Sequence, residues 1–131
     1  MIEFSLPFPP TVNTYYRSLR TGKLAGRVLI SQRGRDYRHQ AIAMILNQGV
    51  PLGALTGKLC CAIKVYPPDK RRRDLDNLLK PVLDVLHHAR VIRDDSDIDI
   101  LMIRRCEQTE LGGLQLCLND ITTIENWENI H

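Results

Sequence analysis

The sequence lacks the features that mark membrane and exported proteins. No apolar run approaches the roughly 20 residues that a membrane span needs. The first residues have no basic start followed by an apolar core, so they do not form a secretory signal. No repeats or low-complexity tracts occur. We therefore expect a cytoplasmic protein with no membrane partner.

Cysteine is scarce and is not arranged for zinc. None of the four cysteines forms a C-x-x-C pair, and the four histidines show no zinc spacing with them. Cys60 and Cys61 are adjacent in a strand-like segment, so we expect their side chains on opposite faces. All four cysteines are interpreted as small buried hydrophobes or as surface thiols in a reducing compartment.

The composition fits one globular domain whose charge is unevenly distributed. A chain of 131 residues with 44% hydrophobic and 25% charged residues is typical of a single soluble domain. Residues 1–73 hold 13 Lys and Arg against 3 Asp and Glu, whereas residues 74–131 hold 5 against 12, which gives +10 and −7. This asymmetry predicts one surface for a polyanion and another for cations. Two solvated faces that neutralise each other are the alternative.

Apolar spacing predicts an α+β domain with a mixed sheet and two main helices. Strand-like segments cover residues 2–6, 58–66, 98–107 and 114–118. The turn at Gly112-Gly113 predicts that the last two segments form a hairpin. Helical spacing covers about 32–48, after Ser31 as N-cap, and about 75–89. We expect a domain over residues 1–119 and a C-terminal tail over residues 120–131.

Residues 11–25 follow three prolines and are expected to form a long loop. The loop interleaves Arg17, Arg20 and Lys23 with the pair Tyr15 and Tyr16. Basic groups beside aromatic rings suit a nucleic-acid backbone and its bases. An ordinary polar loop, attached to the core by the two tyrosines, explains the same pattern.

The most informative segment is residues 71–77, which read Arg-Arg-Arg-Asp-Leu-Asp-Asn. Three adjacent guanidinium groups repel one another, and so do the carboxylates of Asp74 and Asp76. A divalent cation on the aspartates and a phosphate on the arginines would relieve both repulsions. A second acidic cluster, residues 94–97 (Asp-Asp-Ser-Asp), lies about twenty residues downstream and is a candidate to complete the site. The pattern indicates a metal-dependent nuclease.

Structural roles remain open for each of these residues. Asp74 precedes the expected helix and is a natural N-cap. Asp76 and Lys80 lie one turn apart, as in an ordinary surface ion pair, and Pro81 disturbs the first turn. Asp94 and Asp95 suit a turn. Asn77 either caps the helix or hydrogen-bonds the aspartates.

Residues 73–80 (Arg-Asp-Leu-Asp-Asn-Leu-Leu-Lys), followed by Asp94-Asp95, resemble the RusA family of Holliday-junction endonucleases. Residues 6–17 are similar to the family's N-terminal strand and loop, and residues 68–73 to its basic approach to the acidic motif. The resemblance covers most of residues 3–118, and the segment after Asn119 has no counterpart.

The resemblance implies that Asp74, Asp76 and Asp95 bind a catalytic metal and that Lys80 is an essential cation. It implies Mg²⁺, with Mn²⁺ as a substitute, and no organic cofactor. It also implies a homodimer that cuts four-way DNA junctions symmetrically, in recombination and repair. The expected DNA-binding residues are Arg17, Arg71, Arg72, Arg73 and Asn77. A non-catalytic protein that binds branched DNA, or a metal nuclease for flaps or RNA, is the alternative.

Overall fold

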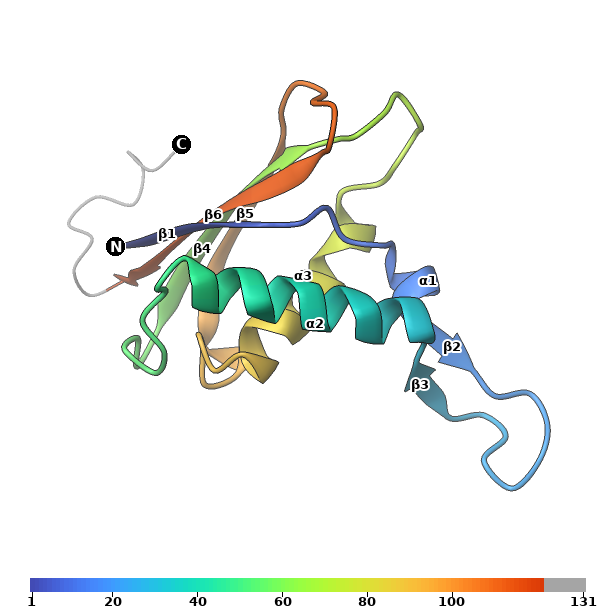
Figure 1. Ribbon diagram of the computed structural model, residues 1–131. Helices are drawn as coiled ribbons and strands as arrows, with labels where there is room; N and C mark the ends of the chain where they lie inside the picture. The colour runs from blue at the N-terminus through green and yellow to red at the C-terminus, as the bar shows by residue number, and fades with distance from the viewer. Residues whose placement is uncertain (122–131) are drawn as a thin grey trace.

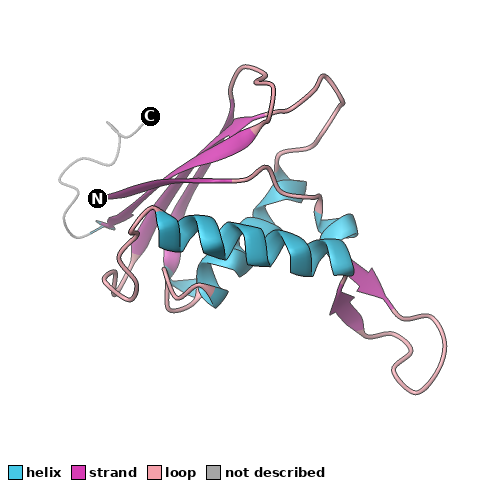
Figure 2. Cartoon of the chain, viewed as in Figure 1, coloured by secondary structure: helices cyan, strands magenta, loops and turns pink. Residues whose placement is uncertain are grey.

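A computed structural model describes residues 1–121, which form a four-stranded sheet with helices against one face (Figures 1 and 2). The part of the expected tail from residue 122 onward lies outside the described residues. In chain order the elements are β1 Ile2–Leu6, α1 Val12–Tyr15, β2 Tyr16–Ser18, β3 Val28–Ile30, α2 Gln32–Asn47, β4 Leu59–Tyr66, α3 Asp76–His88, a 3₁₀ turn Asp95–Asp97, β5 Ile98–Arg105 and β6 Gly113–Asp120. No helix in residues 1–121 is long and apolar enough to cross a membrane. The expected α+β domain with a mixed sheet is confirmed, with α1 as a short third helix.

The strand order is β1-β6-β4-β5, so the predicted hairpin between the last two strands is wrong. Strand β5 is parallel to β4, and β6 is antiparallel to both β4 and β1. Helix α3 carries the chain from β4 to its parallel neighbour β5, as parallel pairing requires. The turn at Gly112 then brings β6 to the other edge of β4. Strand β4 is more buried than β5 and lies between β6 and β5. In the predicted hairpin, β6 would have paired with β5 and not with β4.

The core lies between the sheet and helices α2 and α3. The apolar stripe that spacing predicts for α3 faces it, with Leu78, Val82 and Leu86 all at most 1% exposed. Cys60 and Cys61 are both buried although they point to opposite faces of β4, and all four cysteines are free thiols. The helix axis of α3 is thereby fixed on the sheet, and its opposite face is left to polar side chains.

Helix α3 begins without the aspartate cap that its sequence predicts. Its N-cap is Leu75, which lies in the helical region and makes no side-chain cap hydrogen bond. The N–H of Asn77 donates to the Asp74 carbonyl at 3.2 Å, a tight 3₁₀-type contact. Pro81 lies inside the helix and is buried. The prediction that Asp74 caps this helix through its side chain is therefore wrong.

The expected long loop over residues 11–25 is right only in part, because residues 12–18 form α1 and β2 whereas residues 19–25 are in neither a helix nor a strand. Strands β2 and β3 pair antiparallel, with Tyr16 opposite Ile30 and Ser18 opposite Val28. The N–H of Leu19 donates to the Arg27 carbonyl at 2.9 Å, which extends the ladder beyond the assigned strands. We call residues 16–30 the basic hairpin. The hairpin projects from the body near the start of α2 (Figure 1).

Candidate functional site

Asp74 and Asp76 lie at the start of α3 and are both exposed. Their side chains make no hydrogen bond or ion pair with any residue in the range 1–121. The two structural roles that the sequence allowed, an N-cap for Asp74 and an ion pair of Asp76 with Lys80, are therefore both absent from this part of the chain. Two like charges lie one residue apart at a helix start, and no described cation pairs with either.

Lys80 instead contacts the second acidic cluster. Its Nζ lies 3.6 Å from Oδ2 of Asp95, and the two side chains are 57% and 37% exposed. Lys80 is one turn beyond Asp76 on the same face of α3. This contact brings Asp95 toward the face of α3 that carries Asp76.

The other two aspartates of the second cluster have local partners. The Ser96 hydroxyl donates to Asp94 at 2.5 Å, and this hydrogen bond holds the pKa of Asp94 below its ordinary value. Arg93 donates to both carboxylate oxygens of Asp97, at 3.1 and 2.9 Å. The ion pair with Lys80 of α3 thus belongs to Asp95, and the choice of Asp95 over Asp94 as metal ligand stays a prediction.

The three expected metal ligands fit Mg²⁺ by their chemistry but do not form a closed cage. Within residues 1–121, no three His, Cys, Asp or Glu side chains converge as a metal-binding group. Asp74, Asp76 and Asp95 offer only carboxylate oxygens, the hard ligands that Mg²⁺ takes one or two at a time while keeping several waters. Exposed side chains without partners can rotate toward an ion at little cost. The structure thus supplies the donor set for a hydrated ion.

The three arginines before the acidic motif have different surroundings. Arg71 and Arg72 are exposed, whereas the side chain of Arg73 is only 17% exposed. The Arg73 guanidinium donates to both carboxylate oxygens of Asp69, at 2.7 and 3.0 Å, and its centre lies 5.0 Å from the Phe8 ring centroid. The hydrogen bond from Arg73 is the main cause that lowers the pKa of Asp69. Arg73 therefore supports the loop. Arg71 is exposed, with its Nε 4.0 Å from an Asp69 oxygen, and Arg72 forms no ion pair within residues 1–121.

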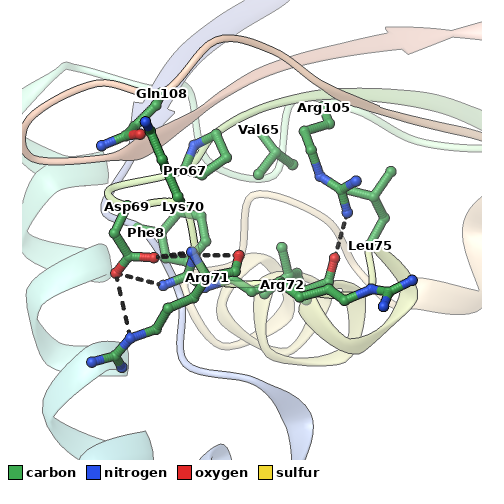
Figure 3. Close-up of a pocket in the computed structure, with 12 residues that line it drawn as sticks. Phe8, Val65, Pro67, Asp69, Lys70, Arg71, Arg72, Leu75, Arg105 and Gln108 are labelled. Atoms are coloured by element: carbon green, nitrogen blue, oxygen red, sulfur yellow. Dashed lines mark hydrogen bonds and ion pairs between the residues drawn. The ribbon is translucent and has the colours of Figure 1, made fainter.

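A basic hollow of about 400 Å³ lies beside the start of α3 (Figure 3). Its floor includes Leu75 and Leu78, and its rim carries Lys70, Arg72 and Arg105. An Arg105 Nη atom donates to the Arg73 carbonyl, which ties the end of β5 to the arginine run (Figure 3). Sequence reasoning missed Arg105, since only the parallel pairing of β5 with β4 brings it here.

A second hollow of about 580 Å³ adjoins the first and extends the basic surface to α2. Both hollows are lined by Asp69, Arg71 and Arg73, and the second also reaches Arg33 in the first turn of α2. A cationic surface thus runs from Arg33 to Arg105, past the start of α3.

A polar network behind the acids joins three helices, and sequence reasoning missed it. The Tyr15 hydroxyl donates to Asp84, and Nη2 of Arg38 donates to the same carboxylate oxygen at 2.8 Å. Burial raises the pKa of the Tyr15 hydroxyl, and the hydrogen bond to Asp84 raises it further, so the hydroxyl stays protonated and donates. Asp84 lies one turn beyond Lys80 on α3, so this network fixes α1 and α2 relative to the helix that bears the acids.

The two remaining expected site residues lie on separate elements. Asn77 is half-buried in the first turn of α3, and its side chain makes no hydrogen bond to any described aspartate. Arg17 is exposed on β2 of the basic hairpin. The structure therefore groups Asp74, Asp76, Lys80 and Asp95 around α3 and places Arg17 on the projecting hairpin.

These features define a small α+β protein with free carboxylates at a helix start and a cationic surface beside them, the arrangement of enzymes that act on polyanions. The family model described as "Endodeoxyribonuclease RusA" matches residues 7–116. The chain belongs to this RusA family of endodeoxyribonucleases and is therefore a nuclease.

Curated relatives agree over nearly the whole chain. The chain is 36% identical to the crossover junction endodeoxyribonuclease of Enterobacteria phage HK97, over 93% of this chain and 97% of the phage protein. It is 35% identical to the enzyme of the same name from Shigella sonnei, over 91% and 94% of the two chains. For the enzyme of Escherichia coli K12 the identity is 34%, with the same coverage of 91% and 94%.

Proposed function

We propose that this protein is a Mg²⁺-dependent endonuclease that resolves four-way DNA junctions. The observation that carries the proposal is the pair of exposed carboxylates, Asp74 and Asp76, that has no described partner and lies between exposed arginines and the Lys80–Asp95 contact. The names of the relatives, crossover junction endodeoxyribonucleases, support the choice of substrate. A role in recombination and repair, in the cytoplasm where the DNA lies, follows from that substrate.

In this proposal Asp74, Asp76 and Asp95 hold the metal ion. A bound Mg²⁺ supplies Lewis acidity to the scissile phosphate and to the attacking water. Asp95 approaches from the second cluster, so the ion is held between α3 and the 3₁₀ turn that follows it. Mn²⁺ can replace Mg²⁺ because it accepts the same oxygen ligands.

Lys80 stabilises charge on the phosphate in this mechanism. Its Nζ faces Asp95 at 3.6 Å and is 57% exposed, so it can turn to a nonbridging oxygen once a metal ion balances Asp95. A flexible lysine stem suits such a movement. A fixed cation beside the developing negative charge lowers the barrier without any proton transfer by the protein.

DNA binding is assigned to exposed cations around the acids. Arg71 and Arg72 border the basic hollow and contact the sugar-phosphate backbone, which gives orientation without base specificity. Arg17 adds a contact from the hairpin. Asn77 lies within the first turn of α3, close to the path of the cut strand. Arg73 acts indirectly, since it holds the loop that presents its two neighbours.

A homodimer completes the proposal. Resolution takes two cuts in strands related by an approximate two-fold axis, and the chain carries one acidic motif. A C₂ dimer presents two sites with the symmetry of the substrate.

The test is the substitution Asp76→Asn, assayed on a labelled junction and on linear duplex. We expect cleavage with Mg²⁺ or Mn²⁺ to be lost, while junction binding is kept or tightened because one repulsive charge is removed. Asp99→Asn is the matched control, since Asp99 is an exposed aspartate of β5 that pairs with Lys58 at 3.8 Å. Ca²⁺ should allow wild-type binding without cleavage, because its looser coordination misplaces the water.

Four outcomes would contradict the proposal. Cleavage by Asp76→Asn near the wild-type rate would remove the catalytic role of the motif. Wild-type activity after exhaustive chelation would exclude metal catalysis. Wild type that binds junctions and never cuts them would favour a non-catalytic binding protein, and cleavage confined to flaps or RNA would show a different substrate.

A further inference from the structure

The basic hairpin, residues 16–30, projects from the body beyond the start of α2 (Figure 1). Internal hydrogen bonds order it to the tip. Beyond the paired strands, the N–H of Gly26 donates to the Leu19 carbonyl at 2.7 Å, and the N–H of Ala25 donates to the Gly22 carbonyl at 3.1 Å. Gly22 and Gly26 both adopt a φ of 86°, the left-handed conformation that such turns need. The hairpin is thus a shaped arm and not an unstructured loop.

The arm carries only positive charge. Its four cations are Arg17, Arg20, Lys23 and Arg27. All four are exposed, and none forms an ion pair within residues 1–121. No acidic residue occurs between Glu3 and Asp36. Four unpaired cations on so short an arm repel one another, and a polyanion relieves that repulsion.

Apolar side chains face solvent among these cations. Leu24, next to Lys23 in the tip, is 43% exposed, and Val28 on β3 is 61% exposed. Single exposed apolar side chains are common, so the feature that distinguishes Leu24 is its place beside Lys23 at the tip of a cationic arm. Leucine is among the side chains that DNA-bending proteins insert between base pairs, where the neighbouring phosphates need cations. The combination at the tip is therefore suited to bases as well as to phosphates.

The root of the arm is rigidly held. Both strands meet at Ser31, whose N–H donates to the Tyr15 carbonyl at 2.9 Å and whose hydroxyl donates to the Thr14 carbonyl at 2.5 Å. Tyr15 is fully buried and donates its hydroxyl to Asp84 of α3. These hydrogen bonds connect the root of the hairpin to α3, the helix that carries Asp76.

The root also adjoins the acidic site. Tyr15, the residue before the hairpin, donates its hydroxyl to Asp84 of α3, one turn beyond Lys80. Helix α1, which leads into the hairpin, packs on α3. This packing places the root of the hairpin beside the helix that carries Asp76 and Lys80.

We propose that the basic hairpin reads the branch point of the DNA, with Leu24 inserted between the unstacked bases at the crossover and the four cations on the phosphates around it. This inference rests on the proposed function and adds the device that selects branched over linear DNA. Base pairs at a branch point lack a stacked neighbour on one side, so insertion costs less there than in continuous duplex. A second copy of this chain is a poorer occupant, since its own hairpin carries the same four positive charges.

The first experiment replaces Leu24 by serine. Its matched control is Leu52→Ser, because Leu52 has nearly equal exposure, 46% against 43%. It belongs to the loop between α2 and β4, which follows the end of α2 away from the hairpin (Figure 1). Wild type and both variants are titrated onto a four-way junction and onto a linear duplex of equal length, in the presence of Ca²⁺. A 2-aminopurine base at the branch point reports unstacking by its fluorescence.

We expect Leu24→Ser to reduce the preference for junction over duplex by about ten-fold and to abolish the fluorescence rise. Leu52→Ser should match wild type in both measurements. Binding to linear duplex should change little in either variant, because phosphate contacts dominate it.

The second experiment replaces Lys23 by alanine, with Lys58→Ala as its control. Lys58 is an exposed lysine at the start of β4, its side chain 77% exposed. The slope of log affinity against log salt on the junction should fall by about 1 for Lys23→Ala and stay constant for Lys58→Ala. An unchanged slope for Lys23→Ala would show that the arm lies outside the complex.

The outcomes separate this inference from the proposed function. If wild type cuts junctions while Leu24→Ser keeps the full preference and the full fluorescence rise, the hairpin is not the branch reader and the nuclease assignment stands. If wild type neither binds nor cuts junctions, the proposed function itself fails. A change in oligomeric state of Leu24→Ser on light scattering would identify the arm as a contact between subunits and overturn its assignment to DNA.

Discussion

Adjacent arginines in this protein do different work, and the difference comes from their partners. Arg72 is exposed at the rim of the basic hollow, whereas Arg73 is held by Asp69 and lies over Phe8. A charge already neutralised by a carboxylate at 2.7 Å has little left to offer a phosphate. The run therefore combines one structural arginine with two that face the ligand.

We predict that Arg72→Ala affects DNA binding and that Arg73→Ala affects stability. Arg72→Ala should weaken junction binding and lower the salt slope by about 1, with unchanged thermal stability. Arg73→Ala should lower the free energy of unfolding by about 1 kcal/mol, because it leaves Asp69 without its partner. Urea denaturation and salt-dependent binding measure the two effects. Asp69→Asn should reproduce the stability loss of Arg73→Ala, and equal salt slopes for both arginine variants would show that the ion pair does not set their roles.

At the scale of single residues, the sequence predicted identities better than contacts. The choice of Asp95 over Asp94 agrees with the contact from Lys80 to Asp95, although nothing in the spacing requires it. The roles of Arg73 and Arg105 were not predictable, because each depends on a residue brought near by tertiary folding. The Tyr15–Asp84 bond spans 69 positions and has no local signal.

At the scale of elements, Gly34 joins the basic hairpin to α2. It lies in the first turn of that helix and is buried against the hairpin root. A Cβ at this position would lie 2.3 Å from the Tyr15 carbonyl oxygen and 2.7 Å from Cγ1 of Ile30. The absence of a side chain lets the hairpin root approach the helix closely enough for the Ser31 N–H to donate to the Tyr15 carbonyl.

Gly34→Ala should therefore destabilise the protein, although alanine is the better helix former. We expect a loss of about 3 kcal/mol, because a backbone carbonyl cannot move aside as a flexible side chain can. Helix propensity alone predicts a gain of about 1 kcal/mol. The midpoint of urea denaturation decides between the two signs. His39→Ala, at an exposed position of the same helix, should stay within about 0.5 kcal/mol of wild type.

Hydrophobic periodicity predicted the long helices and strands, but it did not predict the short strands or the order of strands in the sheet. The strands at residues 2–6 and 58–66 and both main helices occur within one or two residues of their predicted bounds. Strands β2 and β3 have three residues each, too few to show alternation. The order of the sheet was missed because a glycine turn between two strands signals a hairpin locally, whereas the burial of β4 decides which strand lies in the centre.

At the scale of the whole molecule, many charges of the two halves of the chain lie on two separate surfaces. Cations of the first half, with Arg105 from the second, gather around the hollows and along the hairpin. Acids of the second half lie at the start of α3 and in the 3₁₀ turn. The two sets adjoin each other, which is the arrangement that a metal ion on a polyanion requires.

We predict that the active species is a dimer. Light scattering at micromolar concentration should give twice the mass of one chain, since a junction needs two symmetric cuts and each chain carries one acidic motif. On a cruciform plasmid, which separates one cut from two, wild type should produce paired cuts within one binding event. A strictly monomeric protein that made paired cuts in this way would contradict the dimer.

The position of β6 in the sheet also governs when this chain becomes a nuclease. Ile2 pairs with Leu118, and β4 meets β6 along its whole length, so the strand that joins β1 to β4 is made after the whole acidic motif. Until translation reaches β6, β1 has no neighbour and the central strand has one open side. A nascent chain or a prematurely terminated one therefore carries the entire acidic motif without the frame that orients it.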